Sequence, residues 1–468
     1  MQYSVVNYKT VKEKDDFRWD GEFLCFEPKK NPKYKYVQVR DVLRFAQYGI
    51  SIDMNEDGQG YKIYRMNEIS DMFCDLEVDK YADIEEKEMK KFVLKNDDVL
   101  FNRTNSQVFV GRTGIFKKFS DEPLIFASYL VRFRPNTEKI LPEYLTTFLN
   151  TKYGVQDVKR RARISINQSN VSSSELQKVE IPLLPISFQS KLKPLFNKAF
   201  QLILDSQSLY SQAEQLLLSE LGLLDWKPKH TLSFVKNFSD TQKAERIDAE
   251  YFQPKYEEII EAIKKYQGGF DILGNLVKIK DKNFTPKDDE QYKYIELANI
   301  SSNGEINGYV ENFGNELPSR ARRKVQKGDL IISSIEGSLE SIALITEDWK
   351  NALCSTGFFV VGSDKINSET LLVLLKTNVG QLQLKKGCKG TILTAIGKEE
   401  LSKIILPTIN LKIQEEIRKK ITEMYETKKL SKSLLEIAKR GVELAIEKDE
   451  KEAESWINRE LSRFNIIL

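Results

Sequence analysis

A run of basic side chains followed by amide side chains is the part of this sequence best suited to chemistry. From Val158 to Asn170 the chain reads VKRRARISINQSN. Arginine and lysine neutralise phosphates and can grip guanine in the major groove, while asparagine and glutamine can pair with adenine. The alternative is a solvated basic surface, which is what most charge runs are. We treat the stretch as a basic loop and a candidate DNA contact, with the residues Lys159, Arg160, Arg161, Arg163, Asn167 and Gln168.

A second basic stretch lies at the equivalent place in the other half of the chain. It reads KKGCKGT and supplies Lys385, Lys386, Lys389 and Thr391. Two basic stretches at matching places favour DNA phosphate as a shared ligand over chance surface charge.

A third candidate group is the segment NRTNSQVFVGRT, with Arg103, Asn105 and Arg112. Its alternative is a glycine-closed hairpin with exposed polar residues. The equivalent loop, 333–341, contains the candidate Ser334 and is acidic rather than basic. That contrast fits two domains that read different sequences, and it also fits loops without a function.

A fourth group occurs in the second half only. It consists of Arg320, Arg322 and Arg323, which we expect to face phosphates.

Residue types and motifs for most kinds of catalysis are missing. His230 is the only histidine, and the four cysteines form no CxxC pair, which argues against histidine-based nucleophiles and structural zinc. No GxxxxGK[ST] phosphate loop occurs. Asn31-Pro32-Lys33-Tyr34 departs at its third place from the NPPY-like tetrapeptide of adenine methyltransferases.

The composition of the 468 residues fits a soluble globular protein of two or three domains. The net charge of +3 is too small to indicate nucleic acid by itself. Residues 1–14 do not resemble a signal peptide, and no apolar run approaches the roughly 20 residues of a membrane span. We therefore expect a cytoplasmic protein.

Two long amphipathic helices must position these candidates. Apolar residues recur at alternating spacings of four and three from Phe188 to Gly222, and again from Leu411 to Ile446. Pro194 should kink the first turns or mark the start of the straight helix. Because about 35 helical residues extend over roughly 50 Å, each stripe needs an equally long partner. We expect the two helices to pack antiparallel; the alternative is two core helices of separate domains.

The segments before these helices show that the chain is an internal duplication. SELQKVEIPLLPISFQ (174–189) is echoed by EELSKIILPTINLKIQ (399–414) at an offset of 225. YKIYRMNEIS (61–70) is echoed by YKYIELANIS (292–301) at an offset of 231, and Asp98 by Asp329 at the same offset. Because the echoes keep their order, one unit of domain and helix occurs twice.

Each copy mixes strands and helices between these anchors. The patterns predict strands over 61–69, 125–134 and 355–361, a turn followed by a strand over 325–334, and helices over 142–150, 253–266 and 368–376. The run 447–454 reads as a solvated charge run.

This plan resembles the specificity subunit of type I restriction–modification enzymes. NDDVLFNRTNSQVFVGR resembles the family's first-domain signature, and NQSNVSSSELQKVEIPLLPISFQ the start of its central helix. AEQLLLSELGL resembles the end of that helix, and RIDAEYFQPKY the start of the second half. The resemblance covers nearly the whole chain.

The resemblance implies an α+β fold with pseudo-twofold internal duplication. Two similar α/β target-recognition domains would be separated by two long antiparallel helices that form a coiled coil. It divides the chain into a first recognition domain (1–184), a central helix (185–223), a linker (224–249), a second recognition domain (250–408), a C-terminal helix (409–447) and a tail (448–468).

The resemblance further implies a non-catalytic protein that reads a bipartite target on double-stranded DNA, with no membrane association. Two modification subunits would methylate adenine with S-adenosylmethionine, and restriction subunits would use ATP, so this chain would bind no cofactor itself. Two alternatives remain from other classes: a DNA-modifying enzyme with fused recognition domains, and a coiled-coil scaffold that does not bind DNA.

Overall fold

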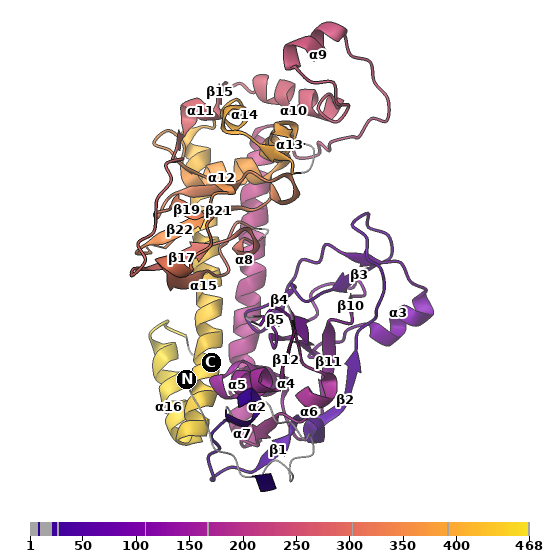
Figure 1. Cartoon of the computed structure of the whole chain (residues 1–468), viewed down its shortest axis with the longest axis vertical. Coiled ribbons are helices and arrows are strands. Elements are labelled where there is room, and N and C mark those ends of the chain that lie inside the picture. The colour runs from indigo at the N-terminus through magenta and orange to yellow at the C-terminus, as the bar shows by residue number, and fades with distance from the viewer. Residues whose placement is uncertain are drawn as a thin grey trace. The chain divides into compact units, whose positions relative to one another are not determined.

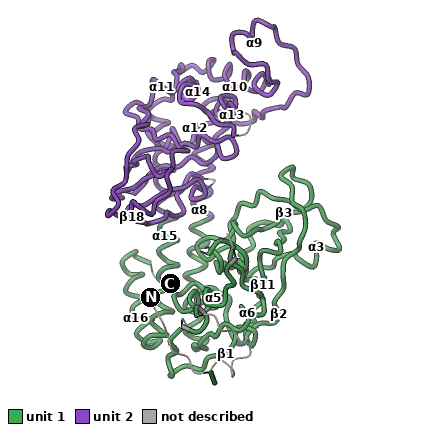
Figure 2. The backbone as a smooth tube through the Cα atoms, viewed as in Figure 1, with its two compact units in different colours: residues 1–203, 429–468 green, residues 204–428 purple. Residues whose placement is uncertain are grey.

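The computed structural model describes residues 8–9, 21–25, 28–107, 109–165, 168–301, 303–347, 349–390 and 393–466. These residues fold into two compact units (Figure 2). Unit 1 comprises residues 1–203 and 429–468, and unit 2 comprises residues 204–428. Among the described residues, no helix is long and apolar enough to cross a membrane. The predicted segment boundaries, which separate helices from domains, divide the chain differently and stay predictions.

Unit 1 is built on a six-stranded sheet with the strand order β2-β11-β7-β9-β5-β4 (Figure 1). The strand β7 (Val99–Asn102) lies near the middle of this sheet, and all four of its residues are buried. The other strands are β2 (Leu43–Tyr48), β11 (Leu130–Pro135), β9 (Thr113–Ile115), β5 (Phe73–Cys74) and β4 (Ile69–Ser70).

Two smaller sheets complete the frame of unit 1. One has the order β10-β3-β6, with β10 (Ile125–Phe126), β3 (Tyr61–Tyr64) and β6 (Tyr81–Ala82). The other pairs β1 (Tyr36–Gln38) with β14 (Glu180–Pro182). The helices of the first half are α2 (Gly21–Cys25), η1 (Val39–Val42), α3 (Glu86–Phe92), α4 (Pro142–Asn150), α5 (Lys152–Arg161), α6 (Ser173–Gln177) and α7 (Ile186–Gln189).

Unit 2 repeats this frame. Its sheet β16-β23-β20-β21 corresponds to β2-β11-β7-β9, with β16 (Lys278–Ile279), β23 (Phe358–Gly362), β20 (Leu330–Ser333) and β21 (Ile342–Leu344). A second sheet has the order β18-β17-β22-β19, with β18 (Val310–Phe313), β17 (Gln291–Ile295), β22 (Ala352–Ser355) and β19 (Ala321–Lys324). β15 (Phe270–Ile272) pairs with β26 (Ile405–Pro407), as β1 does with β14.

The remaining elements of unit 2 are mostly helical. They are α9 (Phe238–Ala244), α10 (Pro254–Lys264), α11 (Leu273–Leu276), η2 (Leu297–Asn299), η3 (Gly314–Glu316), η4 (Glu336–Ser338), α12 (Ser368–Lys376), α13 (Asn378–Lys386) and α14 (Lys398–Ser402). The predicted helices 142–150 and 368–376 are confirmed as α4 and α12. The predicted strands 125–134 and 355–361 are each interrupted by a turn, so those predictions are wrong in their middle parts.

The long helices are α8 (Leu192–Glu220) and α15 (Leu411–Glu447). The helix α8 begins later than Phe188 because a turn at residues 190–191 separates it from α7. Pro194 lies in the first turn of α8. Figure 1 shows the two helices alongside each other. Each unit contains one half of both helices.

Contacts within each unit show that the paired positions run in opposite directions along α8 and α15. In unit 1, buried Ser431 donates its hydroxyl to the Ala199 carbonyl at 2.8 Å. In unit 2, Lys420 donates to the Gln212 side chain at 2.8 Å. The expected antiparallel pairing is therefore confirmed. Ser431 is a polar residue in the apolar stripe of α15, and its buried hydroxyl is satisfied by the hydrogen bond to α8.

A buried glutamine explains one of the sequence echoes. Gln189 accepts from the backbone N–H of Leu141, the residue that precedes α4, and donates to the Leu184 carbonyl, both at 2.8 Å. Gln414 accepts from Asn367 N at 3.2 Å, before α12, and donates to the Ile409 carbonyl at 2.9 Å. Each glutamine ties a domain helix to the base of a long helix.

The charged residues of the predicted solvated run, 447–454, are exposed or half-buried, and the chain around and beyond them is helical. Residues Glu450–Ser462 form α16, whose first turn is capped by Asp449. Ala453, Ile457 and Leu461 are buried in the core of unit 1. The charges of α16 occupy one face of an amphipathic helix, and the apolar positions recur every four residues behind them.

Candidate nucleic-acid interface

A small three-stranded sheet brings two of the predicted groups together in unit 1. Its order is β12-β13-β8, with β12 (Arg163–Ser165), β13 (Gln168–Asn170) and β8 (Thr104–Asn105). Arg163 lies opposite Asn170, which in turn lies opposite Thr104. We call these eight residues together with Arg103 the hairpin sheet. The sequence places its strands about 60 residues apart, so their adjacency is a product of the fold.

Arg103 is the side chain that holds the hairpin sheet together. It donates to the Asn170 side-chain oxygen at 3.2 Å and to the Ser128 carbonyl at 3.3 Å. Its guanidinium stacks on the ring of Tyr48, 4.9 Å from the centroid. Because these donors already have protein acceptors, Arg103 positions its neighbours rather than presenting a free guanidinium.

Among the hairpin-sheet residues whose side chains are described, Arg163, Ile164 and Gln168 are exposed. Ile164 is 55% exposed, which is unusual for a strand residue of its size. Asn105 is half-buried, and its side-chain oxygen accepts from Ser106 N at 2.8 Å. The exposed cation and amide suit phosphate and base-edge contacts, and the exposed aliphatic group, which strand alternation places on the opposite face, suits a thymine-methyl contact.

The expectation of a basic loop facing DNA is wrong for Arg160 and Arg161. Residues 152–161 form α5, and both arginines point back to Asp157, with Nε to Oδ1 distances of 2.5 and 3.1 Å. Arg160 is 4% and Arg161 5% exposed. The signal was present in the sequence, because Asp157 lies three and four residues before them, the spacing of neighbours on one helix face.

The remaining first-half candidates are distributed around this sheet. Lys159 is exposed on α5. Arg112 is exposed, with its guanidinium 4.1 Å from the centroid of the Phe109 ring. Asn167 lies outside the described residues. Sequence reasoning did not identify Tyr48 or Ile164. The alternation of polar and apolar residues over 163–165 could have indicated that Ile164 lies in a strand.

Unit 2 has a hairpin in the same place. β24 (Cys388–Lys389) pairs with β25 (Ala395–Ile396), and Ala395 bridges to Ile335. Ser334 takes the place of Arg103. Its backbone N–H and its hydroxyl both donate to the Gly357 carbonyl at 2.9 Å, as Arg103 N does to Tyr129 at 3.0 Å. The predicted equivalence of the two loops is therefore confirmed, although their side chains differ.

The basic candidates of unit 2 differ in exposure. Lys385 and Lys389 are exposed, and Lys389 pairs with Glu400 at 3.3 Å. Lys386 is half-buried, lies 5.1 Å from the centroid of Tyr251, and has its pKa lowered by burial. Thr391 lies outside the described residues.

The Arg320 group is only partly near this hairpin. The Arg320 carbonyl accepts from Thr356 N at 2.8 Å, next to the Gly357 that binds Ser334, and its side chain is exposed. Arg322 donates to the Ser319 carbonyl at 3.1 Å. Arg323 is half-buried on β19, and its Nε and Nη1 have no hydrogen-bond acceptor. Because these two nitrogens are buried, an external acceptor does not reach them as the structure stands, and the exposed side chain of Arg320 is the better placed of the three to contact DNA.

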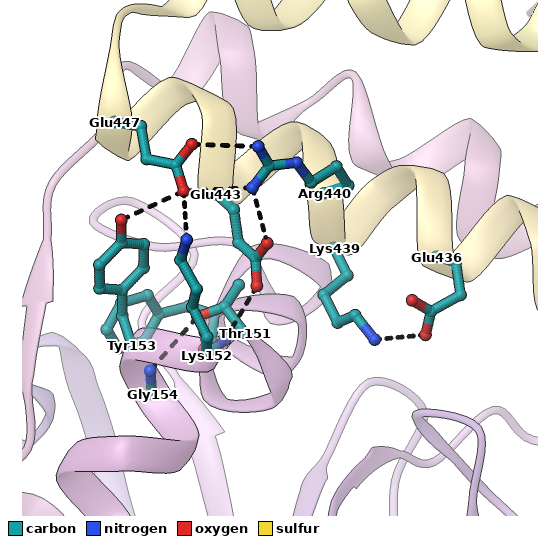
Figure 3. Close-up of polar contacts among 10 residues, drawn as sticks. Thr151, Lys152, Tyr153, Gly154, Glu436, Lys439, Arg440, Glu443 and Glu447 are labelled. Carbon is teal, nitrogen blue, oxygen red and sulfur yellow. Dashed lines mark hydrogen bonds and ion pairs between the residues drawn. The ribbon is translucent and has the colours of Figure 1, made fainter.

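Ion pairs fix the helix that carries the hairpin sheet (Figure 3). Glu443 on α15 is 8% exposed and accepts from the backbone N–H of Lys152, at the start of α5, at 2.9 Å. Lys152 Nζ pairs with Glu447 at 2.6 Å, and Arg440 pairs with both glutamates at 3.1 Å. Since β12 follows the end of α5, the part of α15 in unit 1 sets the position of the hairpin sheet through α5.

The family comparison matches the part of the chain that contains this sheet. Residues 31–192 match the model described as the type I restriction modification DNA specificity domain. The matched region contains the entire hairpin sheet and ends at the first residue of α8.

Two curated relatives match the chain in part. It is 29% identical over 188 residues to the putative type I restriction enzyme MjaX specificity subunit of Methanocaldococcus jannaschii, covering 40% of this chain and 43% of that one. It is 26% identical over 168 residues to the type I restriction enzyme EcoKI specificity subunit of Escherichia coli K12, covering 36% of each. The matches thus span less than half the length of either relative.

A solved structure covers more of the chain at lower similarity. The S subunit of a type I restriction–modification system from M. genitalium aligns with 93% of this chain at 11% identity and a TM-score of 0.37. The function of the chain is therefore inferred from the match of residues 31–192 to the specificity domain.

Replacing Arg163 by alanine is expected to weaken binding to duplex DNA of any sequence and to lower the slope of log K against log salt by about one unit. The reason is the loss of one exposed cation from the hairpin sheet. Arg40→Ala is the matched control, because Arg40 is equally exposed but lies on η1, outside that sheet. Equal slopes for the two variants would place the DNA elsewhere on unit 1.

Proposed function

We propose that this chain is the DNA-reading specificity subunit of a type I restriction–modification complex. The observation that carries the proposal is the repeated hairpin. A specificity domain in unit 1 has a hairpin beside the end of its central strand β7, and unit 2 has a hairpin beside the end of the equivalent strand β20. Two such hairpins with different side chains suit a target made of two different half-sites.

The two hairpins differ in the chemistry they offer. Unit 1 presents Arg163, Gln168 and the 55% exposed Ile164, whereas unit 2 presents Lys389 and the 64% exposed Leu393. Arginine and glutamine discriminate guanine and adenine by paired hydrogen bonds, while an aliphatic side chain suits the thymine methyl group. We therefore propose that each unit reads its own half-site, and that the paired helices α8 and α15 set the distance between half-sites.

In this proposal the chain performs no catalysis. Modification subunits would supply S-adenosylmethionine and methylate adenine after flipping it out of the duplex. Restriction subunits would supply ATP-driven cleavage, and the complex would act in the cytoplasm. Methyl transfer by the purified chain alone would instead favour the alternative of a DNA-modifying enzyme with fused recognition domains.

Exchanging residues 17–180 for the matching segment of a related specificity subunit is expected to change one half of the methylated motif. The other half and the spacer length should stay as they were, because unit 2 and both long helices are retained. Methylome sequencing of cells that carry the assembled system measures all three quantities in one experiment.

The reciprocal exchange of residues 245–405 is the matched control and should change only the other half-site. If either exchange altered both half-sites, or moved the spacer, the assignment of one half-site to each unit would fall. If neither exchange altered the motif, the chain would not be the reader.

A further inference from the structure

The helices α5 and α13 hold the same place in the two repeats, so their residues can be matched one to one. Thr151 precedes α5 and Thr377 precedes α13, and each hydroxyl donates to a carbonyl oxygen three residues earlier. Gly154 and Gly380 follow, and a Cβ added there would lie 2.2 and 2.4 Å, respectively, from the backbone of the preceding helix. Both pairs are 226 residues apart, which fixes the alignment of the two helices.

The counter-ion for the cations at the end of this helix is present in unit 1 and replaced in unit 2. In unit 1, one oxygen of Asp157 accepts from Arg160 at 2.5 Å, and the other accepts from the first backbone N–H of β14 at 3.2 Å. At the same offset these two residues become Gln383 and Lys386. Gln383 keeps the bond to the last strand, since it accepts from the first backbone N–H of β26 at 2.8 Å. It has no charge, so Lys386 loses the carboxylate that neutralises its counterpart.

The cations around Lys386 have carboxylates of their own. The pairs are Lys236 with Glu257, Lys264 with Glu261 and Arg246 with Asp248, with shortest N–O distances of 2.6, 2.8 and 2.7 Å. Lys386 has no ion pair with any residue that the structure describes. Burial lowers the pKa of Lys386, Glu257 opposes this shift, and the three neighbouring cations add to it. Of these four cations, Lys386 is the uncompensated one.

The fold holds the ammonium of Lys386 in a defined place beside the hairpin of unit 2. The ammonium lies 5.1 Å from the centroid of the Tyr251 ring, and the guanidinium of Arg246 lies 4.4 Å from the same centroid. Arg246 also donates to the carbonyl oxygens of Lys386 and Cys388 at 3.3 and 2.8 Å, which fixes the end of α13. Lys386 is half-buried, and its neighbour Lys385 is exposed. Because β24 begins at Cys388, this cation lies two residues from the hairpin.

We infer that Lys386 binds a phosphate group from outside the chain, at a site that unit 2 has and that Asp157 closes in unit 1. A partly buried cation without a counter-ion gains a strong, charge-assisted hydrogen bond from a phosphate oxygen. The inference rests on the proposed function, in which the DNA backbone supplies the phosphate; a free phosphate compound is the other source. Phosphate contacts fix the position of a duplex and carry no sequence information. The site would therefore hold the DNA against the hairpin of unit 2 without reading bases.

The test measures the affinity of the full chain for duplex DNA over a range of salt concentrations. Lys386→Gln removes the cation, and Gln383→Asp supplies the carboxylate that unit 1 has. Each should lower the slope of log K against log salt by about one unit. Lys386→Arg keeps the cation and should retain the wild-type slope. Lys412→Gln is the control, because it makes the same change of charge at an exposed lysine in the first turn of α15.

A second arm distinguishes the two sources of phosphate. Inorganic phosphate is added to the chain at constant ionic strength, and the melting temperature is followed, which also shows that each variant is folded. A rise for the wild type that Lys386→Gln abolishes, together with unchanged DNA slopes, would assign the site to a free phosphate compound.

Two outcomes would overturn the inference and leave the proposed function intact. In the first, neither variant changes the DNA slope or the response to phosphate. In the second, Lys386→Gln lowers the slope while a folded Gln383→Asp does not, because the missing carboxylate then fails to explain the site. A wild-type chain without salt-dependent DNA binding would count against the proposed function, and the phosphate arm would still decide the inference.

Discussion

Replacing Asp98 by alanine is expected to destabilise unit 1 by about 3–5 kcal/mol, because the change leaves the buried guanidinium of Arg132 and the partly buried one of Arg134 without this counter-charge. Asp98 is 1% exposed and receives Arg134 Nε and Nη2 on its two oxygens, both at 2.7 Å. Arg132 Nη1 lies 3.5 Å away, and Arg132 is 4% exposed. Burial lowers the pKa of Arg132 while the charge of Asp98 acts in the opposite direction, so removing Asp98 removes that compensation.

The duplication supplies a control for this prediction. Asp329 occupies the same turn before β20, where it accepts from Gln326 N at 3.1 Å, as Asp98 does from Lys95 N at 2.9 Å. Its ion partner Lys280, at 2.7 Å, is 38% exposed and can return to water. Asp329→Ala should therefore cost at most about 2 kcal/mol.

Urea unfolding combined with hydrogen exchange at β7 and β20 measures the two losses separately. Equal losses would show that the ion pair of Arg132 with Asp98 contributes nothing to the stability of unit 1.

Replacing Leu195 by aspartate is expected to destabilise the protein by at least about 4 kcal/mol, because a carboxylate replaces a fully buried side chain. Leu195 on α8 is 0% exposed and belongs to the core cluster of unit 1 that also contains Leu434, Ala438 and Val442 of α15. Asn197→Asp adds the same charge on the exposed face of α8 and should change stability by less than about 0.5 kcal/mol.

The pH dependence gives a second check on this variant. Burial would raise the pKa of the introduced carboxyl above its unfolded value of about 4. Its protonated form is then tolerated better, so the destabilisation should grow as the pH rises from about 4 to about 8. A loss independent of pH would show that the carboxylate reaches water, and that the helices part at this level.

The long helices show what periodicity can predict and where it stops. The stripe from Leu411 predicted α15 to within one residue of its end, because a heptad pattern leaves few alternatives. The start of α8 was missed by four residues, since a turn between α7 and α8 carries the same apolar spacing as a helix.

The candidate site shows a different limit. Arg163 and Gln168 were identified by residue type and are exposed, but Arg160 and Arg161 were identified by the same rule and are buried. Residue type indicates which ligands a side chain suits. It does not indicate whether the side chain already forms an ion pair with a buried carboxylate such as Asp157. Only the helical spacing of these residues distinguishes the two cases.

The sequence by itself determined the duplication, the two long helices and the resemblance to a specificity subunit. These are local or repeated patterns, and a repeat is visible without any knowledge of contacts. The tertiary structure alone decided which candidates meet in one place. Thr104 and Asn170 become neighbours, and Gln189 reaches Leu141, through bonds between residues tens of positions apart. Such contacts form because each buried polar group must find a partner, and which partner it finds depends on the packing of the whole unit.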